Sequence, residues 1–502
     1  MQPSTAHLER ENTKHILAIW GLLAAFLVLA CALLSTTLSD SAATDLTFAI
    51  NWLYEGLPAF NVGQPHLGFD NPLAILALTA LSAILPDMWT PIVLNMLVMA
   101  GIAQLTWQLS DKLFPGLESS LSKLIFMLLL PLNPLLLQQA GMGETDSLAI
   151  LCFLFYLKYY LSGRPYLAGL SLGLMGLAWF ESLIIAPLLF WILYRQKRAL
   201  FWHTLLPFLG VLAIWFIYAY RQLGSPLPHG VFSDILAFRL DSESEATLRT
   251  SNILQALFGV TIGPAALRIG ATIGGMALAL YGWVKWRHHL GVWLCIGVGA
   301  LYFGYFSLIR TDVFIGTPSF PRFLMYAPIA LGLITLLHSA RLHFAPKVAG
   351  FMWGGVLFIW AALLSGIMLQ TWALQRYYEA GVRKQVALEL TSHPSEVPLN
   401  EKTVLARHVG QLGLHTPLTI YDWFGITSPL ALPVEEGTYL PSRLIAHHQP
   451  TYVVLRDLDV LNMLGAGYDI KRDYRLLKLF EMPDKAPNFI KDNPPYALFE
   501  RR

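Results

Sequence analysis

Long apolar runs recur along this chain with short polar loops between them, and they restrict the fold more than any other feature. The first run, Ile16–Ser35, has about the 20 residues that a helix needs to cross a bilayer. Backbone groups in lipid must bond to one another, which favours helices. Only 13% of the 502 residues are charged, against about 25% in soluble domains. The sequence therefore predicts an all-α polytopic membrane protein.

The positions of the basic residues predict the orientation of these helices. Cytoplasmic loops collect Lys and Arg. Arg10 and Lys14 precede the first run, and the next basic residue is Lys112. We therefore expect a cytoplasmic N-terminus and an extracytoplasmic first loop, residues 37–73. Reading the later runs in the same way predicts about eleven spans.

Two apolar pieces near the first loop are too short to span. Ala42–Tyr54 and Pro72–Leu85 are about 14 residues long or less, a length more typical of interfacial segments. We expect both to form juxtamembrane helices. Leu124–Ala140 is predicted to form one spanning helix.

The C-terminal residues 375–502 differ from the rest because they are more polar and contain no run long enough to span. Gln375–Leu390 has helical periodicity. Alternating or β-branched runs predict four strands, at Leu418–Trp423, Tyr452–Leu455, Tyr474–Met482 and Ala497–Glu500. We therefore expect a transmembrane domain over residues 1–374 and a small extracytoplasmic α/β domain over residues 375–502.

Charge and cysteine usage exclude some classes of partner and site. The net charge of +2 is too small to indicate a nucleic-acid partner. Cys31, Cys152 and Cys295 all lie in apolar runs, where a thiol acts as a small apolar group. We therefore expect the lipid bilayer, and not a nucleic acid, to be the main partner of the chain.

The first loop carries acidic residues but neither Lys nor Arg. Asp40 is the first acidic residue after the first span, where a carboxylate could deprotonate an acceptor hydroxyl. Taken alone, Asp40 fits a helix N-cap better, a role for Asp40 or Ser41 that their residue types favour. Asp45, one helical turn further on, has the same two interpretations.

Other acidic residues lie at the predicted ends of spans. Glu144 falls in the second predicted outer loop, and Glu181 sits at the tip of a hairpin between two apolar segments, where ionisable groups are often functional. His66 and Asp70 could add ligands to a divalent metal site with Asp40 or Glu144, although their spacing matches no defined motif. Whether a metal is required stays open.

Positive charge is unusual in loops predicted to lie outside the membrane. Arg310 and Arg322 flank one such loop, and guanidinium groups bind phosphate in bidentate geometry. They could bind a lipid-linked phosphate or form salt bridges to the acidic loop. His229, in the fourth outer loop, is a further candidate for substrate binding.

Several short motifs occur in a fixed order along the first 240 residues or so. They are Asp40-Ser41-Ala42, Glu55-Gly56, Phe60-Asn61-Val62-Gly63-Gln64, Gly68-Phe69-Asp70-Asn71-Pro72-Leu73, Gly141-Met142-Gly143-Glu144-Thr145, Trp179-Phe180-Glu181-Ser182 and Pro226-Leu227-Pro228-His229-Gly230-Val231. Their order resembles the GT-C superfamily of membrane glycosyltransferases, especially bacterial members related to arabinofuranosyltransferases and protein mannosyltransferases.

The resemblance implies transfer of a sugar from a polyprenyl-phosphate donor to an envelope glycan, lipid or protein outside the cytoplasm of a bacterium. Transfer would invert the anomeric carbon, with Asp40 as the base and Glu144 helping to place a substrate. Asp45, His66, Asp70, Glu181, His229, Arg310 and Arg322 are the substrate-binding candidates. A divalent metal is optional in the superfamily.

The motifs also depart from the family pattern, which leaves two alternatives. Ser41 replaces a second Asp, and Trp179-Phe180 replaces an Arg, as expected of a catalytically degenerate relative with a role in envelope assembly. A transporter or flippase of lipid-linked sugars would show ionisable residues within spans and matched halves. Lys158 and Arg268 are the few such residues, and no internal repeat is evident.

Overall fold

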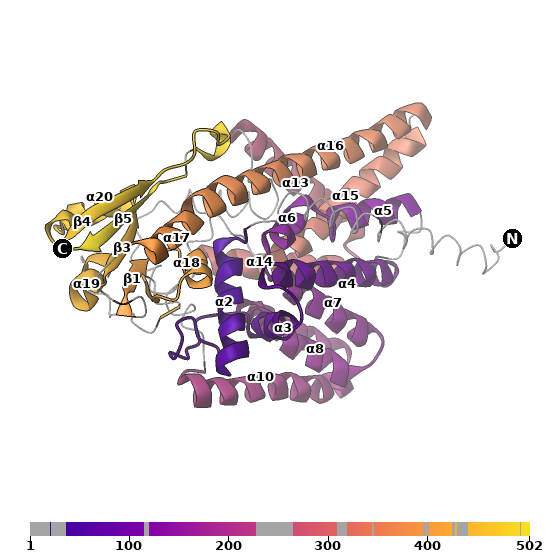
Figure 1. The fold of residues 1–502 in the computed structure, drawn as a ribbon. Coiled ribbons are helices and arrows are strands. Elements are labelled where there is room, and N and C mark those ends of the chain that lie inside the picture. The colour runs from indigo at the N-terminus through magenta and orange to yellow at the C-terminus, as the bar shows by residue number, and fades with distance from the viewer. Residues whose placement is uncertain are drawn as a thin grey trace.

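The computed structural model describes Gly21 and residues 37–114, 120–226, 265–308, 319–343, 346–394, 398, 401–423, 427–428, 440–491 and 493–502. The first predicted span therefore lies outside the described residues. The described part is mostly helical and carries a small sheet near its C-terminal end (Figure 1).

The helices before the sheet run from the first loop to Ser392. They are α2 (Asp40–Glu55), α3 (Pro72–Ser82), η1 (Asp87–Trp89), α4 (Thr90–Leu113), α5 (Ser120–Leu129), α6 (Pro134–Met142), α7 (Ser147–Leu161), α8 (Pro165–Ala178), η2 (Phe180–Ile185), α9 (Ala186–Gln196), η3 (Arg198–Leu200), α10 (Phe201–Leu223), α13 (Ala265–Trp286), α14 (Leu290–Leu308), α15 (Ser319–His343), α16 (Pro346–Ala373), η4 (Leu374–Arg383) and α17 (Lys384–Ser392). The last two of them, η4 and α17, belong with the C-terminal part. The two juxtamembrane helices predicted from the sequence correspond to α2 and α3.

Three helices among the described residues are long and apolar enough to cross a membrane, namely Asp87–Leu113, Arg198–Leu223 and Gly350–Ser392. The last has 43 residues, so it is about 65 Å long, about twice the thickness of the hydrocarbon core. Its apolar part is α16, and η4 and α17 continue the same helix toward the sheet. The count of eleven spans stays a prediction.

The single helix predicted over Leu124–Ala140 is wrong, because this segment forms two helices, α5 and α6. Asn133 separates them by capping α6: its Oδ1 accepts hydrogen bonds from the N–H groups of Leu135 (3.1 Å) and Leu136 (2.9 Å). Pro134 has no N–H to continue the preceding helix and fits the first position of the next.

The C-terminal part is a five-stranded mixed sheet with the strand order β2-β1-β3-β5-β4. Its elements are β1 (Thr403–Ala406), α18 (Gly410–His415), β2 (Thr419–Asp422), α19 (Leu440–His448), β3 (Tyr452–Arg456), α20 (Asp457–Gly465), η6 (Ile470–Arg472), β4 (Tyr474–Phe480), η7 (Asn488–Ile490) and β5 (Tyr496–Arg501). The four predicted strands correspond to β2–β5. The sequence analysis missed β1, which is only four residues long and pairs in parallel with both β2 and β3.

Side chains alternate between the two faces of this sheet, as strand geometry requires. Val404 and Leu498 belong to the large core that also contains the helical body. Leu405 and Val453 point the other way, into a second core closed by α19 and α20. One face of the sheet therefore packs on the helices, and α2 lies between the C-terminal part and the helical body (Figure 1).

Candidate active site

The start of α2 is fixed by its N-cap and by a contact with the loop after α6. Ser39, and neither Asp40 nor Ser41, is the cap: its Oγ accepts a hydrogen bond from the N–H of Ala42 at 3.2 Å. The N–H of Ser39 donates to the carbonyl of Met142, also at 3.2 Å. The carboxylate of Asp40 is thus not used as a cap.

Asp45 joins the first loop to the loop after α6. Its Oδ2 accepts hydrogen bonds from Asn71 Nδ2 at 2.7 Å and from Thr145 Oγ1 at 3.1 Å. Asn71 Nδ2 also donates to Thr145 Oγ1 at 2.9 Å. All three side chains are buried. This buried triad brings Asp45 together with residues of two motifs that are more than 70 residues apart in the sequence.

The surroundings of Asp45 disfavour its charged form. Burial raises the pKa of Asp45 to about 7, and the negative charges of Asp70 and Asp146 act in the same direction. The hydrogen bonds from Asn71 and Thr145 oppose this shift without cancelling it. A substantial share of the Asp45 side chains is therefore protonated near neutral pH.

The hairpin between α8 and α9 also meets the first loop. The N–H of Phe180 donates to the carbonyl of Asp70 at 3.1 Å. Glu181, the next residue, accepts a hydrogen bond through its carbonyl from Tyr302 Oη at 3.3 Å. Trp179 stacks on Tyr302 with ring centroids 5.6 Å apart. The first loop, the loop after α6 and the hairpin tip therefore converge.

The other face of α2 contacts the C-terminal part. Five residues along a helix correspond to a rotation of about 140° from one face to another, so Asp40 and Asp45 point in different directions. Asp40 Oδ1 accepts a hydrogen bond from the N–H of Gly410 at 3.0 Å. Its Oδ2 lies 3.8 Å from His408 Nδ1.

Two further contacts hold the first loop to the sheet region. Asn61 bonds to the backbone of Ile420 in both directions: Nδ2 donates to the carbonyl at 2.9 Å and Oδ1 accepts from the N–H at 2.8 Å. Gln411 Nε2 donates to the carbonyl of Leu38 at 2.8 Å. The candidate site is therefore enclosed by two parts of the chain that are more than 300 residues apart.

Charged residues around Asp40 keep it ionised. Burial acts to raise the pKa of Asp40, but the His408 ring and the positive charge of Arg383 outweigh burial, so this pKa lies below its ordinary value. Burial also lowers the pKa of His408, which is therefore neutral at pH 7. Asp40 has the ionisation state that a base requires at neutral pH.

The remaining predicted residues lie at varying distances from this centre. His66 is buried and its ring lies 6.5 Å from that of Phe48, and Glu144 is half-buried just after α6. Arg322 is in the first turn of α15, and its side chain lies outside the described part. His229 and Arg310 lie outside the described residues altogether.

The described residues do not fit the three-ligand metal site that His66 and Asp70 suggested. Among them, no group of three or more His, Cys, Asp or Glu side chains is placed to hold a metal ion. We therefore assign no step to a metal.

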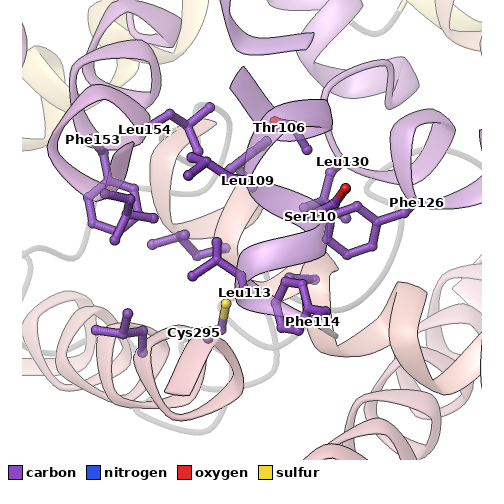
Figure 2. Close-up of a pocket in the computed structure, with 16 residues that line it drawn as sticks. Thr106, Leu109, Ser110, Leu113, Phe114, Phe126, Leu130, Phe153, Leu154 and Cys295 are labelled. Atoms are coloured by element: carbon purple, nitrogen blue, oxygen red, sulfur yellow. The ribbon is translucent and has the colours of Figure 1, made fainter. Parts of the chain in front are cut away.

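An apolar cavity inside the helical body is separate from the acidic centre. It lies between α4, α5, α7, α14 and α15, and Figure 2 shows Leu109, Phe126 and Phe153 around it. α2 meets α4 near Pro91, whereas the cavity lies about 30 Å further along α4, around Ser110. Its volume of about 40 Å³ has room for about one water molecule but not for a lipid chain.

Sequence reasoning missed several residues that the structure brings to the centre. Asn71 and Thr145 were each quoted within a motif, but their pairing with Asp45 depends on contacts between loops. His408, Gly410 and Arg383 gave no local signal, because they approach Asp40 only when the C-terminal part docks.

The helical body with converging loops and the small mixed sheet at one end share the overall fold of a solved GT-C membrane glycosyltransferase. Two structures of ArnT from Cupriavidus metallidurans, a GT-C glycosyltransferase, are similar to the chain over nearly its whole length. The structure with bound undecaprenyl phosphate has a TM-score of 0.52 and 12% identity, covering 97% of this chain and 98% of ArnT. The apo structure has a TM-score of 0.54 and 10% identity, covering 96% and 98%.

The sequence gives no closer relationship. No family model matches it, and no curated protein matches it. At these identities the likeness to ArnT shows the fold alone.

Proposed function

We propose that the chain is a glycosyltransferase of the bacterial inner membrane that takes its sugar from a polyprenyl-phosphate donor. The observation that carries the proposal is the position of Asp40 at the start of the first loop in a GT-C-like fold, where its carboxylate accepts a hydrogen bond from the N–H of Gly410 and lies 3.8 Å from His408 Nδ1. One similar structure, that of ArnT, was solved with undecaprenyl phosphate bound, which supports a donor of this class. In this proposal the N-terminus is cytoplasmic, the C-terminal domain is extracytoplasmic, and the acceptor is an envelope glycan, lipid or protein.

The proposed reaction needs one base and no covalent enzyme intermediate. Asp40 accepts the proton of an acceptor hydroxyl, whose oxygen attacks the anomeric carbon of the donor sugar. The bond from that carbon to the phosphate oxygen breaks as the new bond forms, so polyprenyl phosphate leaves and the configuration inverts. Glu144 helps to place a substrate. The residues assigned to substrate binding are Asp45, His66, Asp70, Glu181, His229, Arg310 and Arg322.

One observation favours the non-enzymatic alternative. Trp179 occupies part of the hairpin tip where the GT-C relatives carry an Arg, and its ring is buried and stacked on Tyr302. A hairpin tip held by apolar packing can support the fold without binding phosphate. A degenerate relative with an assembly role is therefore the second candidate.

The test compares the envelope lipids and glycans of cells that carry the wild type, a deletion, Asp40→Asn or the control Asp87→Asn at matched expression. Asp87 is an exposed acid in η1 and lies outside the candidate site. We expect the deletion to lose one sugar modification, which the wild type and Asp87→Asn restore. Loss of a general base lowers a rate by about 10²–10⁴-fold, so Asp40→Asn should restore almost none.

The other outcomes separate the candidates. If the deletion changes no sugar modification, the transferase proposal is refuted and the assembly role is favoured. If Asp40→Asn restores the modification fully, Asp40 is not the base.

A further inference from the structure

The contact between α2 and α18 is unusually close for two segments separated by about 370 residues. A Cβ added to Gly410 would collide with the backbone carbonyl of Asp40 and would lie 2.9 Å from Thr44 Oγ1. Only glycine fits between these groups without a shift. The same Gly410 donates its N–H to Asp40 Oδ1 at 3.0 Å. The docking therefore places a donor directly on the carboxylate.

Charged and aromatic groups of the C-terminal part surround the other side of Asp40. The charged groups that act on it are His408, with Arg407 beside it, and Arg383 and Glu379 from η4. The ring of Tyr496 from β5 lies 6.2 Å from that of His408. Arg383 Nη1 bonds to Glu379 Oε1 at 2.5 Å, and Arg383 Nε donates to Tyr496 Oη at 3.3 Å.

This cluster is more polar than packing of the two parts would require. The side chains of Arg383 and Glu379 are only 15% and 7% exposed. Among the described residues, Glu379 Oε2 is buried without a hydrogen-bond partner. Burying such groups costs stability unless they are fully paired. An apolar contact would hold the two parts together at a smaller cost in free energy. The presence of polar groups in this contact therefore needs another explanation.

We propose that His408 and Arg383 are positioning residues for Asp40, so that the C-terminal domain completes the active site. This inference rests on the proposed function, in which Asp40 is the base. Gly410 and His408 contact different oxygens of the carboxylate and so restrict its rotation. Arg383 bonds to Tyr496, whose ring lies 6.2 Å from that of His408, so it belongs to the same cluster, and its positive charge favours the ionised form of the half-buried carboxylate.

The two residues have separable effects. His408 is neutral near pH 7, so its removal mainly loosens the orientation of Asp40. Removal of Arg383 takes away a positive charge, which raises the pKa of Asp40. A reaction that requires ionised Asp40 then loses activity at a higher pH than in the wild type.

The experiment measures kcat and KM for a polyprenyl-phosphate-sugar donor as a function of pH, with the purified full-length protein. The variants are His408→Ala, His408→Asn and Arg383→Gln, and His447→Ala and Arg472→Gln are controls at exposed positions of the same domain. We expect His408→Ala to lower kcat about tenfold with KM nearly unchanged, and His408→Asn, which retains a polar group, to recover part of this loss. Arg383→Gln should move the acidic limb of the kcat profile upward by about one pH unit. The controls should match the wild type.

The possible outcomes test this inference separately from the proposed function on which it rests. If the wild type transfers sugar and Asp40→Asn does not, but His408 and Arg383 variants behave like the controls, the inference is refuted and the function stands. A wild type without transfer activity refutes both. If Arg383→Gln does not fold, Arg383→Lys replaces it. This variant keeps the positive charge, so the acidic limb of its kcat profile should lie at the same pH as in the wild type. An acidic limb that moved upward by about one pH unit would contradict the role of the charge.

Discussion

Replacing Asp45 by Asn should stabilise the protein increasingly as the pH rises from about 4 to about 7 and leave its stability unchanged below pH 3.8. The pKa of Asp45 is about 7 in the folded chain, against an ordinary value of 3.8. Each unit corresponds to about 1.36 kcal/mol, so ionising Asp45 weakens the folded state by up to about 4 kcal/mol. The folded state binds the proton more tightly than the unfolded state. Its stabilisation is therefore complete below pH 3.8 and is lost as the pH rises through 7.

The Asn variant removes this pH dependence while keeping the shape of the site. Its Oδ1 can accept the hydrogen bonds from Asn71 and Thr145 that Asp45 Oδ2 now accepts. It cannot ionise, so above pH 7 its free energy of unfolding should exceed that of the wild type. At pH 5 Asp45 is still protonated in the folded chain but ionised in the unfolded chain, so the variant should already be about 1.6 kcal/mol more stable, and the two should be equal only below about pH 3.8.

The assay is thermal unfolding of the purified protein in detergent between pH 5 and pH 8, with Asp87→Asn as the control at an exposed acid. A difference of 1 kcal/mol shifts the Tm by roughly 2–4 °C in domains of moderate size. The Tm advantage of Asp45→Asn at pH 8 should therefore reach several degrees. Parallel Tm curves for wild type and variant would refute the reasoning. A variant less stable at every pH would show that the charge of Asp45 is needed, for example to bind a cation.

Two further predictions concern the docking of the C-terminal part. Gly410→Ala should lower the Tm and abolish sugar transfer, because the added methyl group collides with the carbonyl of Asp40. Gly465→Ala is the matched control, since nothing lies near its added methyl group. Equal effects of the two substitutions would contradict close docking. Asn61→Ala should cost about 2–4 kcal/mol, because it removes two hydrogen bonds and leaves buried backbone groups of Ile420 unpaired. Limited proteolysis should then cleave the chain between α17 and β1 faster than in the wild type, and unchanged cleavage would count against this contact.

Local sequence patterns were enough to predict most elements of the fold. Apolar runs predicted α4 and α10, and alternating or β-branched runs predicted β2–β5, because burial in lipid or in a sheet selects apolar side chains at fixed positions. The pattern failed at Asn133-Pro134, where a cap and a missing N–H divide an apolar run into two helices. It also failed at β1, whose four residues are too few to show a period.

The candidate site, too, was predicted from the sequence only as far as local features determine it. The sequence by itself indicated the acidic first loop and marked Asp40 and Asp45 as candidates, since residue type and predicted position relative to the membrane are local properties. The sequence could not assign different protonation states to the two carboxylates. That difference depends on contacts made only in the folded chain: Asp45 turns toward Asn71 and Thr145, and Asp40 turns toward His408 and Arg383. A pKa is set by the charges and solvent around a group, and for both residues the tertiary structure alone determines those surroundings.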